Sequence, residues 1–335
     1  MTDTPPLRYL CGADVTAAMP PLEERIALAE EALRALGATA EMPPKIGVHP
    51  RQPGSLAHAM PALLQGAAED GSSDLIGMKW IAGFPANQAL GLPAYSALTI
   101  VNDPGTGLPL AVMDAGPITA QRTAAVSGVA IGLFAPRIGD RAPRVAILGA
   151  GAQGLSHLPV IGHLLTGAEV AVVDLDPARA RALAEEATKA EGLGGARAEH
   201  SIRAAVESVD VVVSAVSFGP EHQALDQSWL TAGALFVAVD YDMQAPSALA
   251  EQAFFVVDER SQFLATRGAG GYFAGYPDPD ATLGEVLAAA SAGSADRPAG
   301  RVLVTHLGTG LVDVVFGAAI ARRAEQLGLG TILPR

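Results

Sequence analysis

Three glycines at positions 149–154 follow a short apolar run and precede a stretch of helix-forming residues. The motif is Gly149-x-Gly151-x-x-Gly154, and Asp174 ends a second apolar run 20 residues after the last glycine. In a dinucleotide site these glycines allow a tight turn, close approach of a pyrophosphate and close helix packing, while the helix N-terminus binds phosphate. A carboxylate at position 174 accepts hydrogen bonds from the ribose hydroxyls, which predicts NAD(H) rather than NADP(H).

Two cations lie within apolar segments that otherwise resemble core. Lys79 interrupts the run 76–81, and Arg122 lies in 119–125, where no carboxylate is nearby in sequence. Burying either charge without an anion is costly, so both indicate a partner or a substrate carboxylate. The fork of Arg122 suits bidentate carboxylate recognition. The alternative is that both side chains extend to solvent.

Other candidates are less specific. Lys45 follows two prolines and Arg51 follows His49-Pro50, and each is also compatible with an ordinary surface cation. His58 lies on an expected strand, where a lone histidine is more often structural than catalytic. We find no His/Cys/Asp cluster with metal-ligand spacing, so no metal site is predicted.

Two aspartates follow the apolar run 235–239. Ligands of open α/β sheets bind at the carboxyl ends of the strands, so an acid here can face a cofactor. We interpret Asp242 as a group that exchanges a proton with an amine or water. Asp240 is interpreted as a strand-end or capping residue, and a helix N-cap before Pro246 is the alternative for both.

The composition restricts the classes of function. The 335 residues carry a net charge of −13, which argues against nucleic acid or an acidic membrane as a partner, because both favour a basic surface. One cysteine in the chain excludes an intramolecular disulfide and fits a reducing compartment. No run is typical of a signal peptide or a membrane span. We therefore expect a cytoplasmic protein.

The elements that must position these residues fall into two regions. Before residue 136 we expect a helix at 22–36, strands at 46–48, 57–64, 75–84 and 96–101, a hairpin turn at 102–107 and a helix at 118–133. From residue 144, apolar runs at 145–148, 170–173, 209–213 and 235–239 alternate with helical segments, which predicts a doubly wound parallel sheet. The expected domains are 1–135 with 311–335, a mixed α+β substrate-binding domain, and 136–310, a Rossmann-type α/β domain.

Several motifs occur in an order that resembles the ornithine cyclodeaminase/mu-crystallin family, whose members include archaeal-type alanine dehydrogenases and imine reductases. They are Met42-Pro-Pro-Lys45, His58-Ala-Met-Pro61, Gly77-Met-Lys-Trp80, Phe84-Pro-Ala-Asn87, Asp103-Pro-x-Thr-Gly107, Arg122-Thr-Ala-Ala-Val-Ser127, Gly149-Ala-Gly-Ala-Gln-Gly154, Leu283-Gly-Glu-Val286 and Gly308-Thr-Gly-Leu-Val-Asp313. The resemblance covers nearly the whole chain.

The resemblance implies that the domain 1–135 with 311–335 is also the dimerisation domain of a homodimer. It further implies that the protein binds NAD(H) or NADP(H) and a small amino-acid, keto-acid or imine substrate. It implies that Asp242 and Lys79 are catalytic. The implied substrate-binding residues are Lys45, Lys79, Arg122 and His58. The implied cofactor-binding residues are Gly149, Gly151, Ala152, Gln153, Gly154, Asp174, Leu307 and Gly308.

The implied chemistry is hydride transfer at the α-carbon of an amino acid, which gives an imine. Water converts the imine to a keto acid and ammonia in a dehydrogenase, a side-chain amine closes a ring in a cyclodeaminase, and an imine reductase runs the reduction alone. Ornithine cyclodeaminases, as the resemblance implies, have a glutamate just before the Met-Pro pair. This chain lacks that glutamate and has His58 nearby instead. That departure favours a dehydrogenase or an imine reductase over a cyclodeaminase. A non-catalytic, mu-crystallin-like binding protein is the alternative from another class.

Overall fold

The computed structural model describes residues 5–66, 68, 71, 73–293 and 296–335, and it divides the chain into two compact units. Unit 1 comprises Met1–Arg122 and Thr309–Arg335, and unit 2 comprises Thr123–Gly308. The division falls inside helix α3 (Gly116–Phe134), earlier than the boundary after residue 135 expected from the sequence. A continuous helix carries the chain from one unit to the next, so no proline or glycine break marks the position.

Unit 1 is built on a sheet whose strand order is β16-β1-β7-β6-β5-β4-β2, with β3 paired to β4. Neighbouring strands are antiparallel except β1 and β7. The turn predicted at 102–107 joins β6 to β7. The strands are β1 (Leu7–Leu10), β2 (Ala40–Glu41), β3 (Ile46–Val48), β4 (Leu56–Leu64), β5 (Leu75–Gly83), β6 (Tyr95–Asn102), β7 (Pro109–Asp114) and β16 (Thr331–Leu333).

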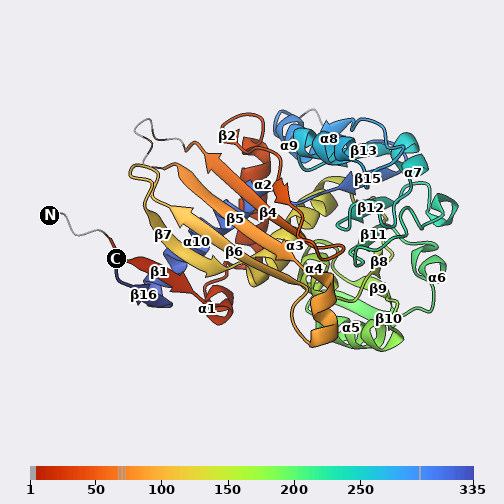
Figure 1. Ribbon diagram of the computed structural model, residues 1–335. Helices are drawn as coiled ribbons and strands as arrows, with labels where there is room; N and C mark the ends of the chain where they lie inside the picture. The colour runs from red at the N-terminus through yellow and green to blue at the C-terminus, as the bar shows by residue number, and fades with distance from the viewer. Residues whose placement is uncertain (1–4, 67, 69–70, 72, 294–295) are drawn as a thin grey trace. The chain divides into compact units, whose positions relative to one another are not determined.

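One face of this sheet is covered by α10 (Gly310–Gln326), which packs on β4, β5 and β6 and against α2 (Leu22–Ala35) (Figure 1). The approach is close: a Cβ on Gly317 would stand 2.9 Å from Cγ2 of Thr99. The opposite face, which we call the open face, exposes Tyr9, Ile76, Trp80, Leu98 and Leu110. The remaining short helices are α1 (Gly12–Ala17) and the 3-10 turn η1 (Pro85–Leu90).

Unit 2 contains an entirely parallel sheet of order β10-β9-β8-β11-β12-β15-β13-β14. The direction of winding reverses between β8 and β11, which is where such sheets bind ligands. The strands are β8 (Arg144–Leu148), β9 (Ala168–Val173), β10 (Leu193–Ala198), β11 (Val211–Ser214), β12 (Leu235–Ala238), β13 (Phe254–Val257), β14 (Ala281–Thr282) and β15 (Val302–Thr305).

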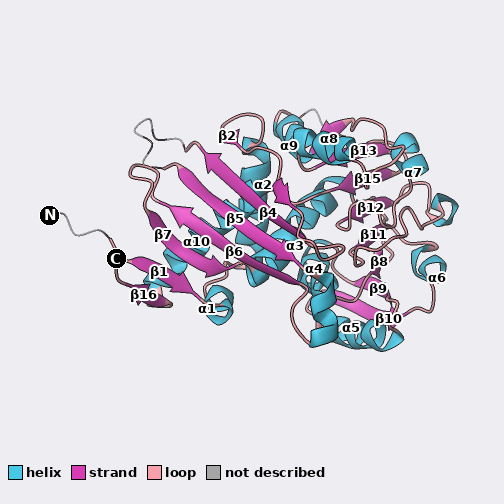
Figure 2. Cartoon of the chain, in the orientation of Figure 1, coloured by secondary structure: helices cyan, strands magenta, loops and turns pink. Residues whose placement is uncertain are grey.

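Helices connect these strands, as Figure 2 shows. They are α4 (Ala152–Leu164), α5 (Pro177–Lys189), α6 (Ile202–Val206), α7 (Ser247–Gln252), α8 (Arg260–Ala269) and α9 (Leu283–Ser291), with the 3-10 turn η2 (Gln227–Trp229). Four central strands, β8, β11, β12 and β15, are buried at nearly every position because both faces of the sheet are covered. The predicted α/β, doubly wound Rossmann-type sheet is confirmed. Among the described residues, no helix has the length and apolar character needed to cross a membrane.

Candidate active site

The glycine motif forms the turn between β8 and α4. Gly149 has φ +100°, and a Cβ there would stand 2.4 Å from the carbonyl oxygen of Ala215, which follows β11. Gly151 is the N-cap of α4. A Cβ on Gly154 would stand 2.3 Å from the carbonyl oxygen of Gly149, so only glycine allows this helix to approach the turn. The turn therefore brings the N-terminus of α4 to the point where the sheet reverses.

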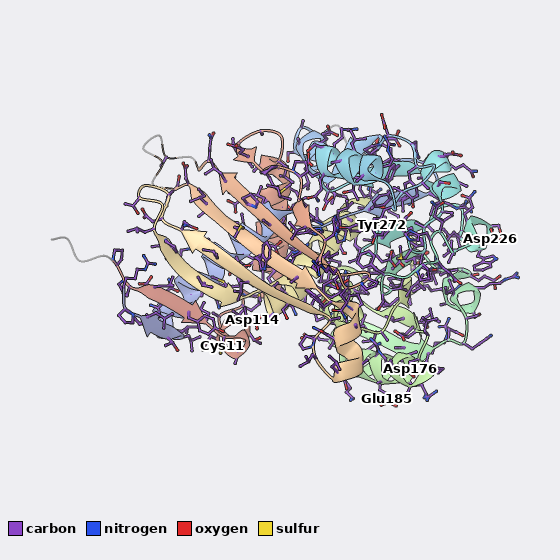
Figure 3. The ribbon with its side chains drawn as sticks, in the orientation of Figure 1. Cys11, Asp114, Asp176, Glu185, Asp226 and Tyr272 are labelled. Atoms are coloured by element: carbon purple, nitrogen blue, oxygen red, sulfur yellow. The ribbon has the colours of Figure 1, made fainter. Side chains whose placement is uncertain are left out.

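Asp174 follows β9 and faces this turn. Its Oδ2 accepts from the amide of Ala150 at 2.7 Å, and its Oδ1 accepts from the amide of Asp176 at 2.9 Å. Asp176, labelled in Figure 3, caps α5 by accepting from the amide of Ala178. Arg179 on α5 reaches the same turn, because its Nη2 is 3.3 Å from where a Cβ on Gly151 would stand. The carboxylate of Asp174 and the guanidinium of Arg179 thus both lie close to the glycine turn.

The segment after β15 contains the predicted residues Leu307 and Gly308. The amide of Gly308 donates to Oδ2 of Asp258 at 2.8 Å, and its carbonyl oxygen accepts from Nε2 of Gln262 at 3.1 Å. Gly308 has φ +80°, which favours glycine. Leu307 is 6% exposed. Two buried polar side chains therefore hold this segment in one conformation.

A buried hydrogen-bond chain, which the sequence did not reveal, runs from the helix after the glycine turn to the segment after β15. The carbonyl oxygen of Gln153 contacts Nδ1 of His157 at 2.6 Å, and Nε2 of His157 contacts Oγ of Ser127 at 2.8 Å. The same Oγ contacts Nε2 of His306 at 2.9 Å. Burial lowers the pKa of His157 to about 4. His157 is therefore neutral, and its Nδ1 donates to the carbonyl of Gln153 while its Nε2 accepts from Ser127.

In unit 1, the predicted cations Lys79 and Arg122 meet at one carboxylate, that of Asp313. Nζ of Lys79 is 3.3 Å, and Nε of Arg122 is 3.0 Å, from Oδ1 of Asp313. The three residues are 1%, 5% and 0% exposed. The solvent-exposed alternative for both cations is thus wrong. Asp313 is the sole charged side chain of the apolar stretch Gly310–Ile320 on α10, and that isolation was the available signal of its role.

This buried triad carries a surplus positive charge. Two cations face one carboxylate, and Nη1 of Arg122 and Oδ2 of Asp313 are buried without a hydrogen-bond partner in the described structure. Burial lowers the pKa of Lys79 to about 8, although Asp313 opposes the effect. A second carboxylate would supply the charge that the triad lacks, and it would pair with the unpartnered guanidinium nitrogen.

Lys45 and His58 belong to the same unit. The charge of Lys45 contributes to lowering the pKa of Lys79 and of His58, so it lies near both. Burial is the main reason that the pKa of His58 falls to about 4. His58 lies on β4 on the same side as Met60, whose register partner on β5 is Lys79. His58 is therefore a neutral side chain on the face of the sheet that carries Lys79.

Asp240 and Asp242 follow β12 in unit 2 and differ in their contacts. Oδ2 of Asp240 accepts from Oγ of Ser214 at 2.5 Å and from the amide of Val216 at 3.1 Å, so this carboxylate joins the ends of β11 and β12. Burial raises the pKa of Asp240 to about 6.

The carboxylate of Asp242 is 1% exposed and has a different set of partners. Its Oδ1 contacts Nδ1 of His222 at 2.9 Å, and its Oδ2 accepts from the amide of Phe273 at 2.7 Å. No sequence pattern pointed to His222. It lies in a loop after β11 and approaches Asp242 only through the fold.

The chain is similar in sequence and in structure to proteins of one family. The model of the ornithine cyclodeaminase/mu-crystallin family matches residues 13–325. The nodulation efficiency protein NfeD of Rhizobium meliloti is 37% identical over 333 residues, 98% of each chain. A Δ1-pyrroline-2-carboxylate reductase from Thermococcus litoralis, solved with NADH and L-proline, superposes with a TM-score of 0.81 at 25% identity over 97% of this chain and 99% of that one. An archaeal alanine dehydrogenase dimer with bound NAD gives 0.80 at 25% identity, covering 98% and 99%.

Proposed function

Because this chain belongs to the ornithine cyclodeaminase/mu-crystallin family, we propose that it is an NAD(H)-dependent oxidoreductase acting at the α-carbon of a small amino acid. The two reactions that we favour are amino-acid dehydrogenation and imine reduction. Both interconvert an amine and an imine by hydride transfer, and related structures carry the names of both activities.

The surplus positive charge of the Lys79–Asp313–Arg122 triad supports a substrate that carries a carboxylate. A carboxylate bound there would neutralise the triad and satisfy Nη1 of Arg122. Charge-assisted bonds of this kind are about twice as strong as neutral ones. In this proposal the triad binds and orients the α-carboxylate, and Lys45 adds positive charge beside it.

The residues of unit 2 fit a dinucleotide. A side chain at Gly149 or Gly154 would collide with backbone, so glycine at both positions allows the tight turn and the close approach of α4 to it. Phosphate would bind at that N-terminus, and Asp174 would accept from the ribose hydroxyls. When bound there, NAD(H) would accept or supply the hydride. Leu307 and Gly308 would contact its nicotinamide end.

The proton that accompanies this hydride is assigned to the Asp242 region. Asp242 lies at the carboxyl end of β12, next to β11 in the sheet, where ligands of doubly wound sheets bind. Asp240 has a different task in this proposal, because its contacts to Ser214 and Val216 hold two strand ends together.

An assay panel tests the function. We expect the purified protein to consume NADH, measured by its absorbance, with one or more pairs of a keto acid and an amine or with a cyclic imino acid. In the oxidative direction, NAD⁺ and the amino acid should produce NADH. A keto acid plus ammonia as substrates indicates the dehydrogenase, and a preformed cyclic imine indicates the reductase. Ammonia release from ornithine without net NADH change would instead indicate a cyclodeaminase. Cofactor binding without turnover on any substrate would indicate a binding protein.

The proposed assembly is a homodimer formed through the open face of unit 1. This face exposes large apolar side chains from four strands, which is typical of an interaction surface. Light scattering should give twice the mass of the chain. Trp80→Glu should yield monomers, whereas Leu155→Glu, at an exposed leucine on α4, should not. A monomeric wild-type protein would refute the assembly.

A further inference from the structure

Both oxygens of the buried Asp242 carboxylate already have a hydrogen-bond partner in the protein. Oδ2 is occupied by the amide of Phe273 and Oδ1 by Nδ1 of His222, and the side chain is 1% exposed. The His222 side chain is 27% exposed. Within the described part of the chain, no hydrogen-bond partner lies at Nε2 of His222. The accessible end of this pair is therefore the imidazole and not the carboxylate.

The geometry of the pair defines how protons are arranged on it. A carboxylate at Nδ1 accepts the Nδ1 hydrogen, so Nε2 carries the lone pair in the neutral ring and a hydrogen in the imidazolium. Asp–His pairs in which a buried carboxylate orients an imidazole use this arrangement to move protons at Nε2.

The backbone around the pair is built to hold it. Amides of Gln223, Ala224 and Leu225 donate to the carbonyl oxygens of Asp242, Met243 and Gln244, which fastens the His222 loop to the Asp242 loop. The Gln223 side chain donates to the carbonyl of Ala274 and accepts from the amide of Ser247.

Backbone strain is concentrated at the same place. In the described structure four non-glycine residues have positive φ, and three of them, Gln223 (+55°), Tyr241 (+62°) and Phe273 (+60°), adjoin His222 or Asp242 or donate to Asp242. Such conformations cost about 1–3 kcal/mol each and persist where the surrounding structure enforces them, often at functional sites.

From these observations we propose that His222, oriented by Asp242, is the residue that exchanges the proton with the substrate nitrogen. The inference rests on the proposed function. In the reductive direction Nε2 of His222 would give its proton to the imine nitrogen, while NADH, when bound, would supply the hydride that adds to the imine carbon. The C=N π bond breaks, C–H and N–H bonds form, the imine is reduced and the nicotinamide is oxidised. His222 then regains a proton from water. Asp242 acts through His222 and is a positioning residue.

The neighbours of His222 contribute to its environment. Besides Asp242, the titratable groups packed around it are Tyr272, whose ring centroid is 5.3 Å away, and Tyr241, which contacts Tyr272. Glu221 precedes it in the loop. Phe218 packs on both tyrosines, so the imidazole lies at the edge of an aromatic cluster and next to Tyr272, which is labelled in Figure 3.

Two substitutions separate proton exchange from structure. Asn at position 222 keeps a donor near the place of Nδ1, so His222→Asn should fold, bind NADH as wild type does and lose about 100-fold or more in turnover. His222→Ala should behave alike and regain turnover when imidazole is added, because imidazole can occupy the space. His200→Asn, at an exposed histidine of the same unit, is the matched control and should change nothing.

A second readout does not depend on turnover. Carbethoxylation of histidines by diethyl pyrocarbonate, followed by peptide mass spectrometry, should label both His222 and His200 in the free protein. NADH together with the carboxylate product of the reaction should protect His222 and leave His200 labelled. Labelling of His222 that is unaffected by both ligands would overturn the inference.

The outcomes for the two proposals are distinct. If His222→Asn turns over as fast as the wild type and with the same pH profile, the role of His222 is overturned and the proposed function still stands. Absence of turnover by the wild type on every substrate of the panel overturns the proposed function and this inference with it. Rescue of His222→Ala by imidazole supports both.

Discussion

The buried lysine of the triad makes the stability of unit 1 depend on pH in a defined direction. Burial lowers the pKa of Lys79 from 10.5 to about 8 in the folded protein. Between these two values the unfolded chain binds more protons than the folded one, so the free energy of unfolding rises with pH. Lys79→Met removes this effect and leaves Arg122 and Asp313 paired one to one.

The magnitude follows from the shift. At about 1.4 kcal/mol per pKa unit, the full effect is about 3 kcal/mol, of which about 2 kcal/mol should develop between pH 7.5 and 10. Urea unfolding of wild type and Lys79→Met at several pH values measures it as a difference, in which shared titrations cancel. A Trp229→Phe background leaves Trp80, the neighbour of Lys79 on β5, as the fluorescent reporter of unit 1.

Lys189 supplies the control. It is exposed and its pKa is raised, chiefly by a hydrogen bond to Glu186. Its contribution to stability is lost as pH rises through the raised pKa, so wild type minus Lys189→Met should not increase with pH. A difference between wild type and Lys79→Met that stays constant or falls from pH 7.5 to 10 would refute the reasoning about the buried triad.

Four further outcomes are expected. Arg122→Ala should weaken substrate binding by about 2–5 kcal/mol, or roughly 30- to several-thousand-fold, while NADH affinity stays unchanged in a fluorescence titration, and Arg122→Lys should also bind substrate poorly because a point charge cannot reproduce the fork. Asp174→Ala should narrow the preference for NADH over NADPH in steady-state assays, and equal use of both cofactors by wild type would contradict the assignment. Gly154→Ala should abolish nucleotide binding measured by calorimetry, whereas Gly195→Ala, whose Cβ meets no atom within 4 Å, should not. Burial raises the pKa of Asp240 from 3.8 to about 6, so the free energy of unfolding should fall by about 2 kcal/mol as pH rises from 4 to 6, and Asp240→Asn should flatten this slope in urea titrations.

Local patterns predicted much of the fold because its main signals are local. The glycine turn, the apolar strands of the parallel sheet and the hairpin at 102–107 each depend on residues close in sequence. The division between the units falls inside the continuous helix α3, where no local break in the sequence marks it.

The candidate site was predictable only in part. Lys79 and Arg122 stood out as cations in apolar segments, but their carboxylate partner is 234 residues from Lys79 and is set by how α10 packs on β5. His222 carried no signal at all, because its contact with Asp242 depends on two loops joined by backbone hydrogen bonds. Pairings of this kind depend on tertiary contacts that periodicity does not encode.

The discontinuous make-up of unit 1 sets an order of events during synthesis. Unit 2 is one uninterrupted segment, Thr123–Gly308, and is translated in full before α10 is made. Domains fold as units while the chain emerges from the ribosome, and every residue of unit 2 is made before the Asp313 carboxylate with which Lys79 and Arg122 pair. A chain that ends before α10 therefore contains all of unit 2 but lacks the carboxylate that pairs with Lys79 and Arg122, so its buried cations have no partner.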